Sequence, residues 1–189
     1  MDFYSNKNLN VKMCRDICIV LFCWYALLRY DDVSQLKVED VKIDNDVYDI
    51  FIKAAKNDRF CNGQQISIRL SSKCLYFVNK YFVKSGVLKE KTNFLFPSVK
   101  RNVILGEKKL NYEDMRLSLL DLLVEVGIDT GNVSTHSLRV GGCTEVSRAG
   151  VPDYLVDAFG RWAYNSTARA RYQRCLKGDF LKVSEVLNK

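Results

Sequence analysis

Residues that suit phosphate chemistry are concentrated toward the C-terminal end of the chain. His136 and Arg139 lie three residues apart, and Trp162 and Tyr172 follow them. An arginine fork binds the nonbridging oxygens of a phosphate in pairs, and a phenol can act as a nucleophile. The imidazole can shuttle a proton, and the indole N–H is one more donor. This combination favours chemistry on a phosphodiester.

The N-terminal half offers the remaining groups that cleavage of a phosphodiester requires. The reaction needs charge stabilisation on two oxygens, an in-line nucleophile and a proton for the departing 5′ oxygen. We expect Arg29, at the end of an apolar helix, to face a cleft and to share the phosphate with Arg139. Asp32 would orient Arg29, Lys56 on a hairpin tip would donate the proton, and Tyr172 would be the nucleophile.

Three of these assignments have ordinary structural alternatives. His136 could simply begin a helix that Ser134 or Thr135 caps. Arg29 could be a side chain that extends from the end of a core helix toward water. Trp162 could serve packing alone. A His and an Arg three apart share one helix face, so we expect His136 and Arg139 to act together.

Two assignments have rivals of the same residue type. Lys53 is a near neighbour of Lys56, and lysines on hairpins are commonly just solvated. Tyr172 competes with Tyr154 and Tyr164, but its Arg-x-Arg-Tyr setting and its distance from Trp162 favour it.

The charge of the chain favours a polyanionic partner. The formal net charge is +7 and the pI is near 9.0. From residue 161 to the end, seven bases against two acids leave a net +5. A solvated helix face is the alternative, but arginines beside a Trp and a Tyr favour contact with phosphates. The arginines that we expect to contact DNA are Arg59, Arg161, Arg169, Arg171 and Arg174.

The cysteines and the apolar segments limit the class of protein. The seven cysteines form no C-x-x-C pair, so we expect reduced thiols, an intracellular protein and no bound metal. The most apolar run, residues 17–28, is about half of the ~20 residues that span a bilayer. No targeting segment is evident, and no membrane association is expected. The compartment would be the nucleus in a eukaryote, or the cytoplasm or nucleoid in a bacterium or phage.

The periodicity predicts one domain of the α+β class that is mainly helical. Apolar spacing predicts a long buried helix over residues 9–28, and Asp31 or Asp32 can cap a second, short helix. Strand character appears at 41–43, 47–52 and 65–70, which predicts a small antiparallel sheet of three strands with a hairpin loop at 56–63. Further helices are expected at 72–85, 111–126, 135–149, 152–160 and 166–175, with a long basic loop over 97–110.

Four blocks of the sequence resemble the catalytic domain of the tyrosine recombinases, the phage-integrase family, over nearly the full length. Residues 26–36, ALLRYDDVSQL, resemble the first arginine box with its acid three residues later. Lys56 falls in the lysine hairpin, and residues 136–142, HSLRVGG, resemble the H-x-x-R box. Gly160-Arg161-Trp162 followed by Tyr172 resembles the family's ending, although the gap from Trp162 to Tyr172 is about one residue longer than usual.

The resemblance implies a helical bundle with a small three-stranded sheet, and site-specific cleavage and rejoining of double-stranded DNA. Arg29, Arg139 and His136 would bind the scissile phosphate, and Lys56 would protonate the leaving 5′ hydroxyl. Tyr172 would form a 3′-phosphotyrosine. No metal or other cofactor is required, and a homo-tetramer on DNA is expected.

Some expectations about the whole protein stay open. Residues 1–189 are expected to form a catalytic domain alone, without the additional N-terminal clamp domain that the family usually has. An amphipathic tail at 180–187 would pack on its own domain or on a neighbouring subunit. The parent would be a recombinase or integrase of a mobile element or virus. A type IB topoisomerase and an inactive, domesticated DNA-binding module are the alternatives.

Overall fold

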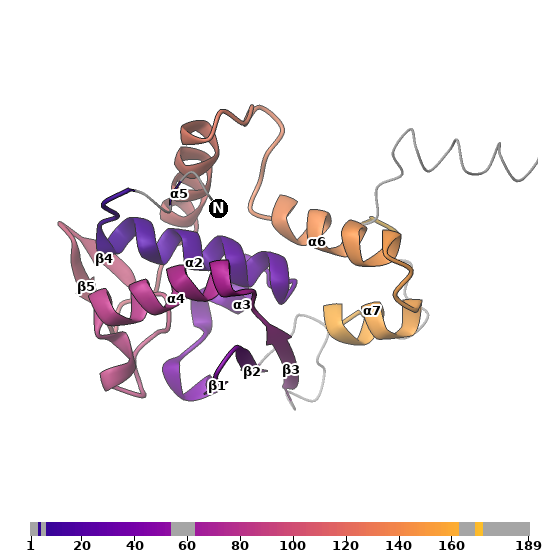
Figure 1. Ribbon diagram of the computed structural model, residues 1–189, viewed down its shortest axis with the longest axis horizontal. Helices are drawn as coiled ribbons and strands as arrows, with labels where there is room; N and C mark the ends of the chain where they lie inside the picture. The colour runs from indigo at the N-terminus through magenta and orange to yellow at the C-terminus, as the bar shows by residue number, and fades with distance from the viewer. Residues whose placement is uncertain (1–3, 5–6, 54–62, 163–168, 172–189) are drawn as a thin grey trace, which may run out of the picture.

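The computed structural model describes residues 4, 7–53, 63–162 and 169–171 (Figure 1). Its helices are α2 (Val11–Tyr25), α3 (Tyr30–Gln35), α4 (Ser72–Ser85), α5 (Tyr112–Glu125), α6 (Ser137–Arg148) and α7 (Asp153–Gly160). Its strands are β1 (Val41–Asp44), β2 (Val47–Ile52), β3 (Gln64–Arg69), β4 (Ser98–Lys100) and β5 (Val103–Leu105). Short 3-10 turns lie at Val38–Asp40, Val87–Lys89 and Arg169–Arg171. The expected class, α+β and mainly helical with a three-stranded sheet, is confirmed.

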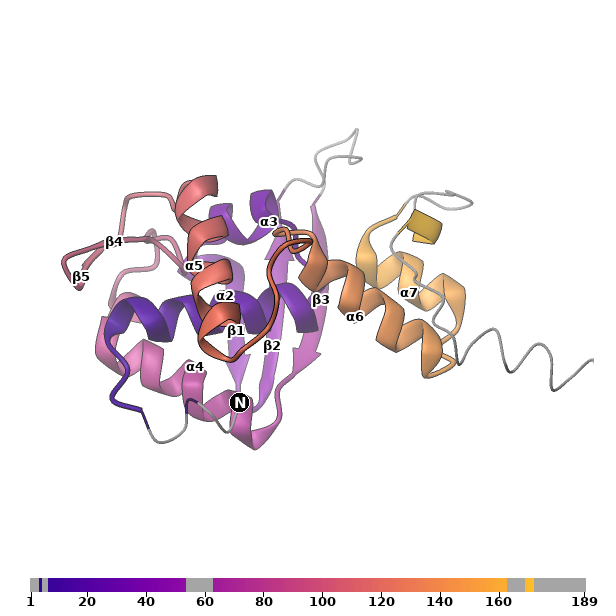
Figure 2. The same cartoon turned by 90° about the horizontal axis from the view of Figure 1, so that it is seen from above.

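Helix α2 is the centre around which the other helices pack. Asn10 caps its start by accepting a hydrogen bond from the Met13 main-chain N–H. Cys14, Cys18 and Phe22 recur at helical spacing and are fully buried. The helix contacts α3, α4, α5 and α6, and Figures 1 and 2 show it running through the middle of the molecule. A burial of this kind explains why the helix is apolar on nearly all sides.

The three-stranded sheet pairs its strands in the order β1-β2-β3, and both pairs are antiparallel. Tyr48, Ile50 and Ile52 alternate with exposed or half-buried neighbours and face the core. The Tyr48 ring meets Phe22 of α2 edge-on at a centroid distance of 5.8 Å. These contacts fix the register and hold the start and end of the β2–β3 connection against the helical core. Residues 54–62 of that connection lie outside the described residues.

Two expectations about the secondary structure were wrong. Residues 97–110 were expected to be a loop, but β4 and β5 pair there through a tight turn at Arg101 and Asn102, with φ of 50° and 62°. Left-handed angles at both central residues match the twist of a hairpin, and strands of three residues give too little pattern to detect. The first helix ends at Tyr25 rather than at residue 28, since Leu27 has a left-handed φ of 48°.

The other predicted elements are confirmed within a few residues. The helix at 72–85 has the predicted limits, with Ser71 as N-cap and Gly86 at a φ of 60° as C-cap. Of the helix expected at 166–175, only the turn Arg169–Arg171 belongs to the described residues. None of the helices in the described part of the chain has the length and hydropathy to cross a membrane.

Helix α6 approaches the end of α2 through two glycines. A Cβ on Gly142 would lie 2.7 Å from the main-chain oxygen of Trp24, and one on Gly141 would lie 2.5 Å from the Trp24 ring. Together with α7, α6 lies at one end of the molecule beyond the C-terminal end of α2 (Figure 2). The glycines therefore set how closely the H-x-x-R box of α6, which is the second arginine box, approaches the first arginine box.

Replacing Gly142 with alanine should destabilise the protein by about 1–3 kcal/mol, because the main chain of Trp24 must move. In an unconstrained helix the same change would instead stabilise the protein by about 0.5–1 kcal/mol. The sign of the change in unfolding free energy therefore shows whether Gly142 is packed tightly against Trp24. Urea unfolding followed by circular dichroism measures the difference. Glu145→Ala, at an exposed position of α6, is the control, and a stabilising Gly142→Ala would contradict the packing described here.

Candidate active site at the end of helix α2

The turn that joins α2 to α3 lies at the centre of the candidate site. Ala26, Leu27 and Leu28 are at most 1% exposed, and half-buried Arg29 is the N-cap residue of α3. The expectation that Arg29 ends the first helix is corrected: it begins the next one, four residues after Tyr25. Main-chain carbonyls at the end of a helix carry partial negative charge. Buried as they are, these carbonyls require donors from elsewhere in the protein.

Arg139 of α6 supplies one set of donors. Its guanidinium donates to the main-chain oxygens of Leu27 and Gly160, and its side chain is 0% exposed. The guanidinium carbon lies 4.3 Å from the centroid of the Trp162 ring, a cation–π contact. Trp162 itself is buried in a small apolar cluster with Leu27. The structure thus brings the first arginine box, the second and Trp162 into direct contact.

Arg161 supplies the second set of donors, which corrects its assignment to a DNA-contacting surface. The residue is 5% exposed, and one guanidinium nitrogen donates to the Asp32 carboxylate at 2.8 Å and to the Leu27 carbonyl at 3.1 Å. Burial lowers the pKa of Arg161, the Asp32 charge opposes that effect, and the nearby charge of Arg29 adds to it.

Asp32 binds different groups from those expected. Its carboxylate accepts hydrogen bonds from the main-chain N–H of Arg29, at 2.9 Å, and from the guanidinium of Arg161. The first bond caps α3, as the sequence suggested for Asp31 or Asp32, although Arg29 rather than an aspartate is the N-cap residue. The carboxylate therefore fixes the main chain of Arg29 and the side chain of Arg161. The structure gives no bond from Asp32 to the Arg29 guanidinium.

His136 and Arg139 differ in exposure. His136 stands at the N-cap position of α6 and is exposed, whereas Arg139 points into the protein. His136 lines an open hollow of about 490 Å³ together with Trp24 and Ser137. The main chain of His136 is helical, with φ −76° and ψ −19°, and its carbonyl accepts the Val140 N–H at 2.9 Å, so the two residues follow helical spacing while their side chains differ in exposure.

Arg169 is also engaged by protein carboxylates rather than facing an open surface. Its guanidinium forms ion pairs with Asp153 at 2.8 Å and with Asp157 at 2.6 Å, both on α7. This contact neutralises the charge that was expected to meet DNA. The side chain of Arg171 is not described, and Lys56, Arg59, Tyr172 and Arg174 lie outside the described residues, so these assignments stay predictions.

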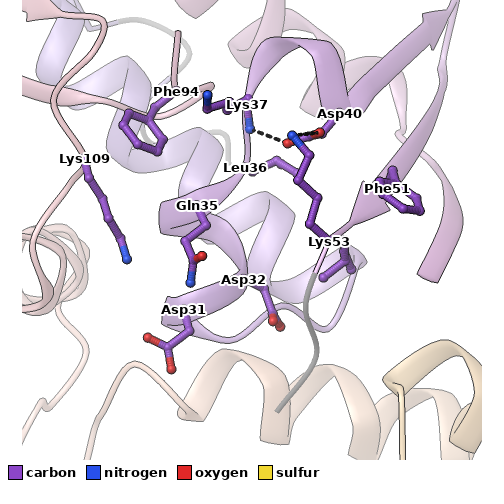
Figure 3. Close-up of a pocket in the computed structure, with 11 residues that line it drawn as sticks. Asp31, Asp32, Gln35, Leu36, Lys37, Asp40, Phe51, Lys53, Phe94 and Lys109 are labelled. Atoms are coloured by element: carbon purple, nitrogen blue, oxygen red, sulfur yellow. Dashed lines mark hydrogen bonds and ion pairs between the residues drawn. The ribbon is translucent and has the colours of Figure 1, made fainter. Parts of the chain in front are cut away.

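A hollow of about 380 Å³ lies between α3, the end of β2 and the segment near Lys109 (Figure 3). Asp32 lies at one side of this hollow, and Lys53 at another. Lys53 binds Asp40 at 2.7 Å and Glu39 at 2.9 Å, and these hydrogen bonds raise the pKa of Lys53. The rival of Lys56 is thus already held by two carboxylates at the point where β2 leads into residues 54–62.

Two features that shape this site could not be inferred from residue types alone: the requirement for glycine at position 160 and the burial of Arg161. A Cβ on Gly160 would lie 1.7 Å from the Trp162 ring, so a glycine is required where that ring folds back on α7. Gly160-Arg161-Trp162 forms a sequence motif, but Arg161 is buried against Asp32, a partner 129 residues away. In the described part of the chain, no group of three or more His, Cys, Asp and Glu residues is placed to hold a metal.

Comparison with known proteins finds solved structures of similar fold. The chain resembles the XerH site-specific recombinase bound to a palindromic difH substrate, with a TM-score of 0.72 and 14% identity over 100% of this chain and 50% of that one. It resembles XerA recombinase, with a TM-score of 0.67 and 20% identity over 93% of this chain and 57% of that one. It also resembles the Tn1549 transposon integrase in complex with transposon right end DNA. The TM-score is 0.63 and the identity is 14%, over 100% of this chain and 62% of that one.

The chain therefore spans roughly half to three fifths of the length of these structures, and the likeness concerns the fold. None of the curated proteins matches it. The sequence model described as the phage integrase family matches residues 1–178. The chain belongs to the phage integrase family.

Proposed function

We propose that this protein cleaves and rejoins double-stranded DNA at a specific site through a covalent 3′-phosphotyrosine on Tyr172. One observation carries the proposal: the guanidiniums of Arg139 and Arg161 meet at a single buried carbonyl, with Arg29 close by and the Asp32 carboxylate paired with Arg161. Positive charge gathered at a helix end in this way suits a phosphate.

In this proposal the two arginine boxes share the scissile phosphate. Arg29 approaches from the start of α3 and Arg139 from α6, while Arg161 remains bound to Asp32. Because main-chain carbonyl oxygens accept the N–H groups of Arg139, the phosphate must compete for them. Contacts of catalytic groups often form fully only in the substrate complex. His136 would contact the phosphate from the outer side of α6.

The covalent step balances without an added energy source. The Tyr172 oxygen attacks the phosphorus, the bond to the 5′ oxygen breaks, and Lys56 gives its proton to that oxygen. The free 5′ hydroxyl then attacks the phosphotyrosine to restore a phosphodiester. Residues 1–189 would act as the catalytic domain, and four subunits would form a tetramer on DNA. The protein would work inside the cell, in the compartment that holds its target DNA. The known structures of XerH and of the Tn1549 integrase, solved with DNA, support DNA as the partner.

A pool of duplexes tests the function directly. Each duplex carries a nick beside a randomised central segment, so that cleavage releases a short strand that cannot return and the covalent product accumulates. We expect a protein–DNA adduct that survives denaturing electrophoresis and becomes enriched in particular sequences. Binding that falls steeply with salt but yields no adduct from any sequence would leave a DNA-binding module. Relaxation of supercoiled plasmid without sequence enrichment would indicate a topoisomerase.

Lys56→Ala should slow cleavage by about 10²-fold or more, since the leaving 5′ oxygen loses its acid. A duplex with sulfur at the bridging 5′ position releases a thiolate, which needs no proton. The defect should therefore disappear on the sulfur substrate. Lys53→Gln is the matched control, because Lys53 is bound to Asp40 and Glu39. A Lys56→Ala defect of equal size on both substrates would exclude the general-acid role.

A further inference from the structure

We propose that Arg161 is a positioning residue: its guanidinium holds the turn between α2 and α3 so that Arg29 and Arg139 can meet at one phosphate. The proposal rests on the proposed function above. It gives a role in the reaction to a residue that the sequence suggested was a surface contact for DNA.

The contacts of Arg161 tie together three parts of the turn. One guanidinium nitrogen donates to the carboxylate of Asp32 at 2.8 Å and to the main-chain oxygen of Leu27 at 3.1 Å. The other donates to the main-chain oxygen of Ala26 at 3.4 Å. The same carboxylate oxygen of Asp32 accepts the main-chain N–H of Arg29 at 2.9 Å. A single side chain therefore connects the last carbonyls after α2 with the first N–H of the next helix.

The turn needs such a partner because it cannot satisfy its own carbonyls. The last turn of α2 contains no basic residue, and Ala26 and Leu27 are at most 1% exposed, so water has little access to them. Leu27 adopts a φ of 48°, which is unfavourable for a residue with a branched side chain. A buried cation at the negative end of a helix stabilises this conformation.

The position of Arg161 in the chain places it beside both arginine boxes, so that it can hold the two together. It is the C-cap residue of α7 with a φ of 59°, and its main-chain N–H donates to Ala158. The Leu27 oxygen that it binds also accepts a bond from Arg139. Trp162, the next residue, lies against the Arg139 guanidinium at 4.3 Å. Loss of the Arg161 guanidinium would thus remove hydrogen bonds that hold the turn and the start of α3 in place, and would leave Arg139 less firmly positioned.

A direct phosphate contact by Arg161 makes different predictions from a positioning role. Each arginine that neutralises a DNA phosphate contributes about one unit to the slope of log affinity against log salt. Arg161 is 5% exposed and already paired with Asp32. Its replacement should therefore leave DNA affinity and the salt slope unchanged, and reduce only the rate of the cleavage step.

The experiment compares Arg161→Lys and Arg161→Met with Arg148→Met in the full chain. Lysine keeps the charge beside Asp32 but lacks the planar fork that spans the carboxylate and the carbonyls, so it preserves folding better than methionine does. Arg148 lies on α6, is exposed and pairs with Glu145 at 3.1 Å, which makes it a matched surface arginine. DNA affinity at several salt concentrations and the single-turnover rate of adduct formation are measured on the enriched nicked duplex.

A third measurement does not depend on activity. Hydrogen exchange followed by mass spectrometry reports the amides of Arg29 and Val33, whose partners are the Asp32 carboxylate and the Arg29 carbonyl. We expect exchange in the peptide covering residues 26–36 to become at least tenfold faster in both Arg161 variants, while a peptide from β2 stays at the wild-type rate. Arg148→Met should match the wild type in both peptides.

The outcomes separate the two proposals. Cleavage slower by about 10²-fold at unchanged affinity and salt slope, with faster exchange in residues 26–36, supports the positioning role. A salt slope reduced by about one shows that Arg161 contacts a phosphate, and wild-type cleavage in both variants shows that it does not position the site. If the wild type itself forms no adduct, the proposed function fails. Unchanged hydrogen exchange in the Arg161 variants would also overturn the positioning role of Arg161.

Discussion

Replacing Tyr172 with phenylalanine should abolish the covalent adduct with nicked DNA while the protein keeps its DNA affinity. The substitution removes only the hydroxyl, so the nucleophile is lost and the aromatic ring stays. The rate of adduct formation should fall by about 10⁴-fold or more, as it does when an enzyme loses its nucleophile. Denaturing electrophoresis measures the adduct, and fluorescence anisotropy measures the affinity.

The matched controls are the two neighbouring tyrosines. Tyr154→Phe changes a side chain on α7 that is 67% exposed and should form the adduct at the wild-type rate. Tyr164→Phe addresses the longer gap between Trp162 and Tyr172, which made Tyr164 the alternative nucleophile. If Tyr164→Phe abolishes the adduct and Tyr172→Phe does not, the assignment of the nucleophile is wrong.

Arg139→Lys should lower the cleavage rate by about 10²- to 10³-fold, far more than it lowers DNA affinity. A guanidinium that stabilises charge in the transition state contributes about this much, and an ammonium cannot replace its paired N–H geometry. Because Arg139 is fully buried and donates to Leu27 and Gly160, the variant should also lose about 1–3 kcal/mol of stability. Single-turnover kinetics and urea unfolding measure the two effects separately.

Arg148→Lys is the control for this variant, since it lies on the same helix and is exposed. It should change neither the rate nor the stability by a measurable amount. The amplitude of the single-turnover reaction reports the folded, competent fraction, so a loss of rate at full amplitude is chemical. Cleavage within twofold of the wild type would show that Arg139 has only a structural role.

The parts of the fold with strong local signals could be predicted from the sequence. The helix expected at 72–85 and the strand expected at 47–52 have the predicted limits, and in the structure Ser71 and Gly86 cap the helix while Tyr48, Ile50 and Ile52 are the buried residues of the strand. These signals act within a few residues of one another, and the structure confirms them. The hairpin of β4 and β5 was missed because its turn uses Arg101 and Asn102 in place of glycine.

The candidate site was predicted in part, because its chemistry depends on contacts between distant segments. The motifs that contain Arg29, Arg139 and Trp162 do lie together at the end of α2. Arg161, in contrast, appears from composition to be a surface base, and only the folded chain shows Asp32 beside it. A sequence indicates which cations are present, whereas burial decides which of them remain available to DNA.

The positions of His136 and Arg169 illustrate the same limit. His136 and Arg139 follow the spacing of one helix, yet His136 is exposed and Arg139 is buried, a difference that the spacing alone does not predict. Arg169 was grouped with DNA-contacting arginines, yet two carboxylates of α7 bind it. Burial and ion pairs across the fold are set by tertiary packing, which local patterns do not encode.

The most direct test of the central claim is a crystal structure of the trapped covalent adduct with nicked DNA. We expect a single phosphate bonded to the Tyr172 oxygen, with N–H groups of Arg29 and Arg139 both within about 3 Å of its nonbridging oxygens. His136 and Lys56 should border the same phosphate, and Arg161 should remain on Asp32. Guanidiniums of Arg29 and Arg139 that lie in separate regions, with only one of them near the phosphate, would contradict the central claim.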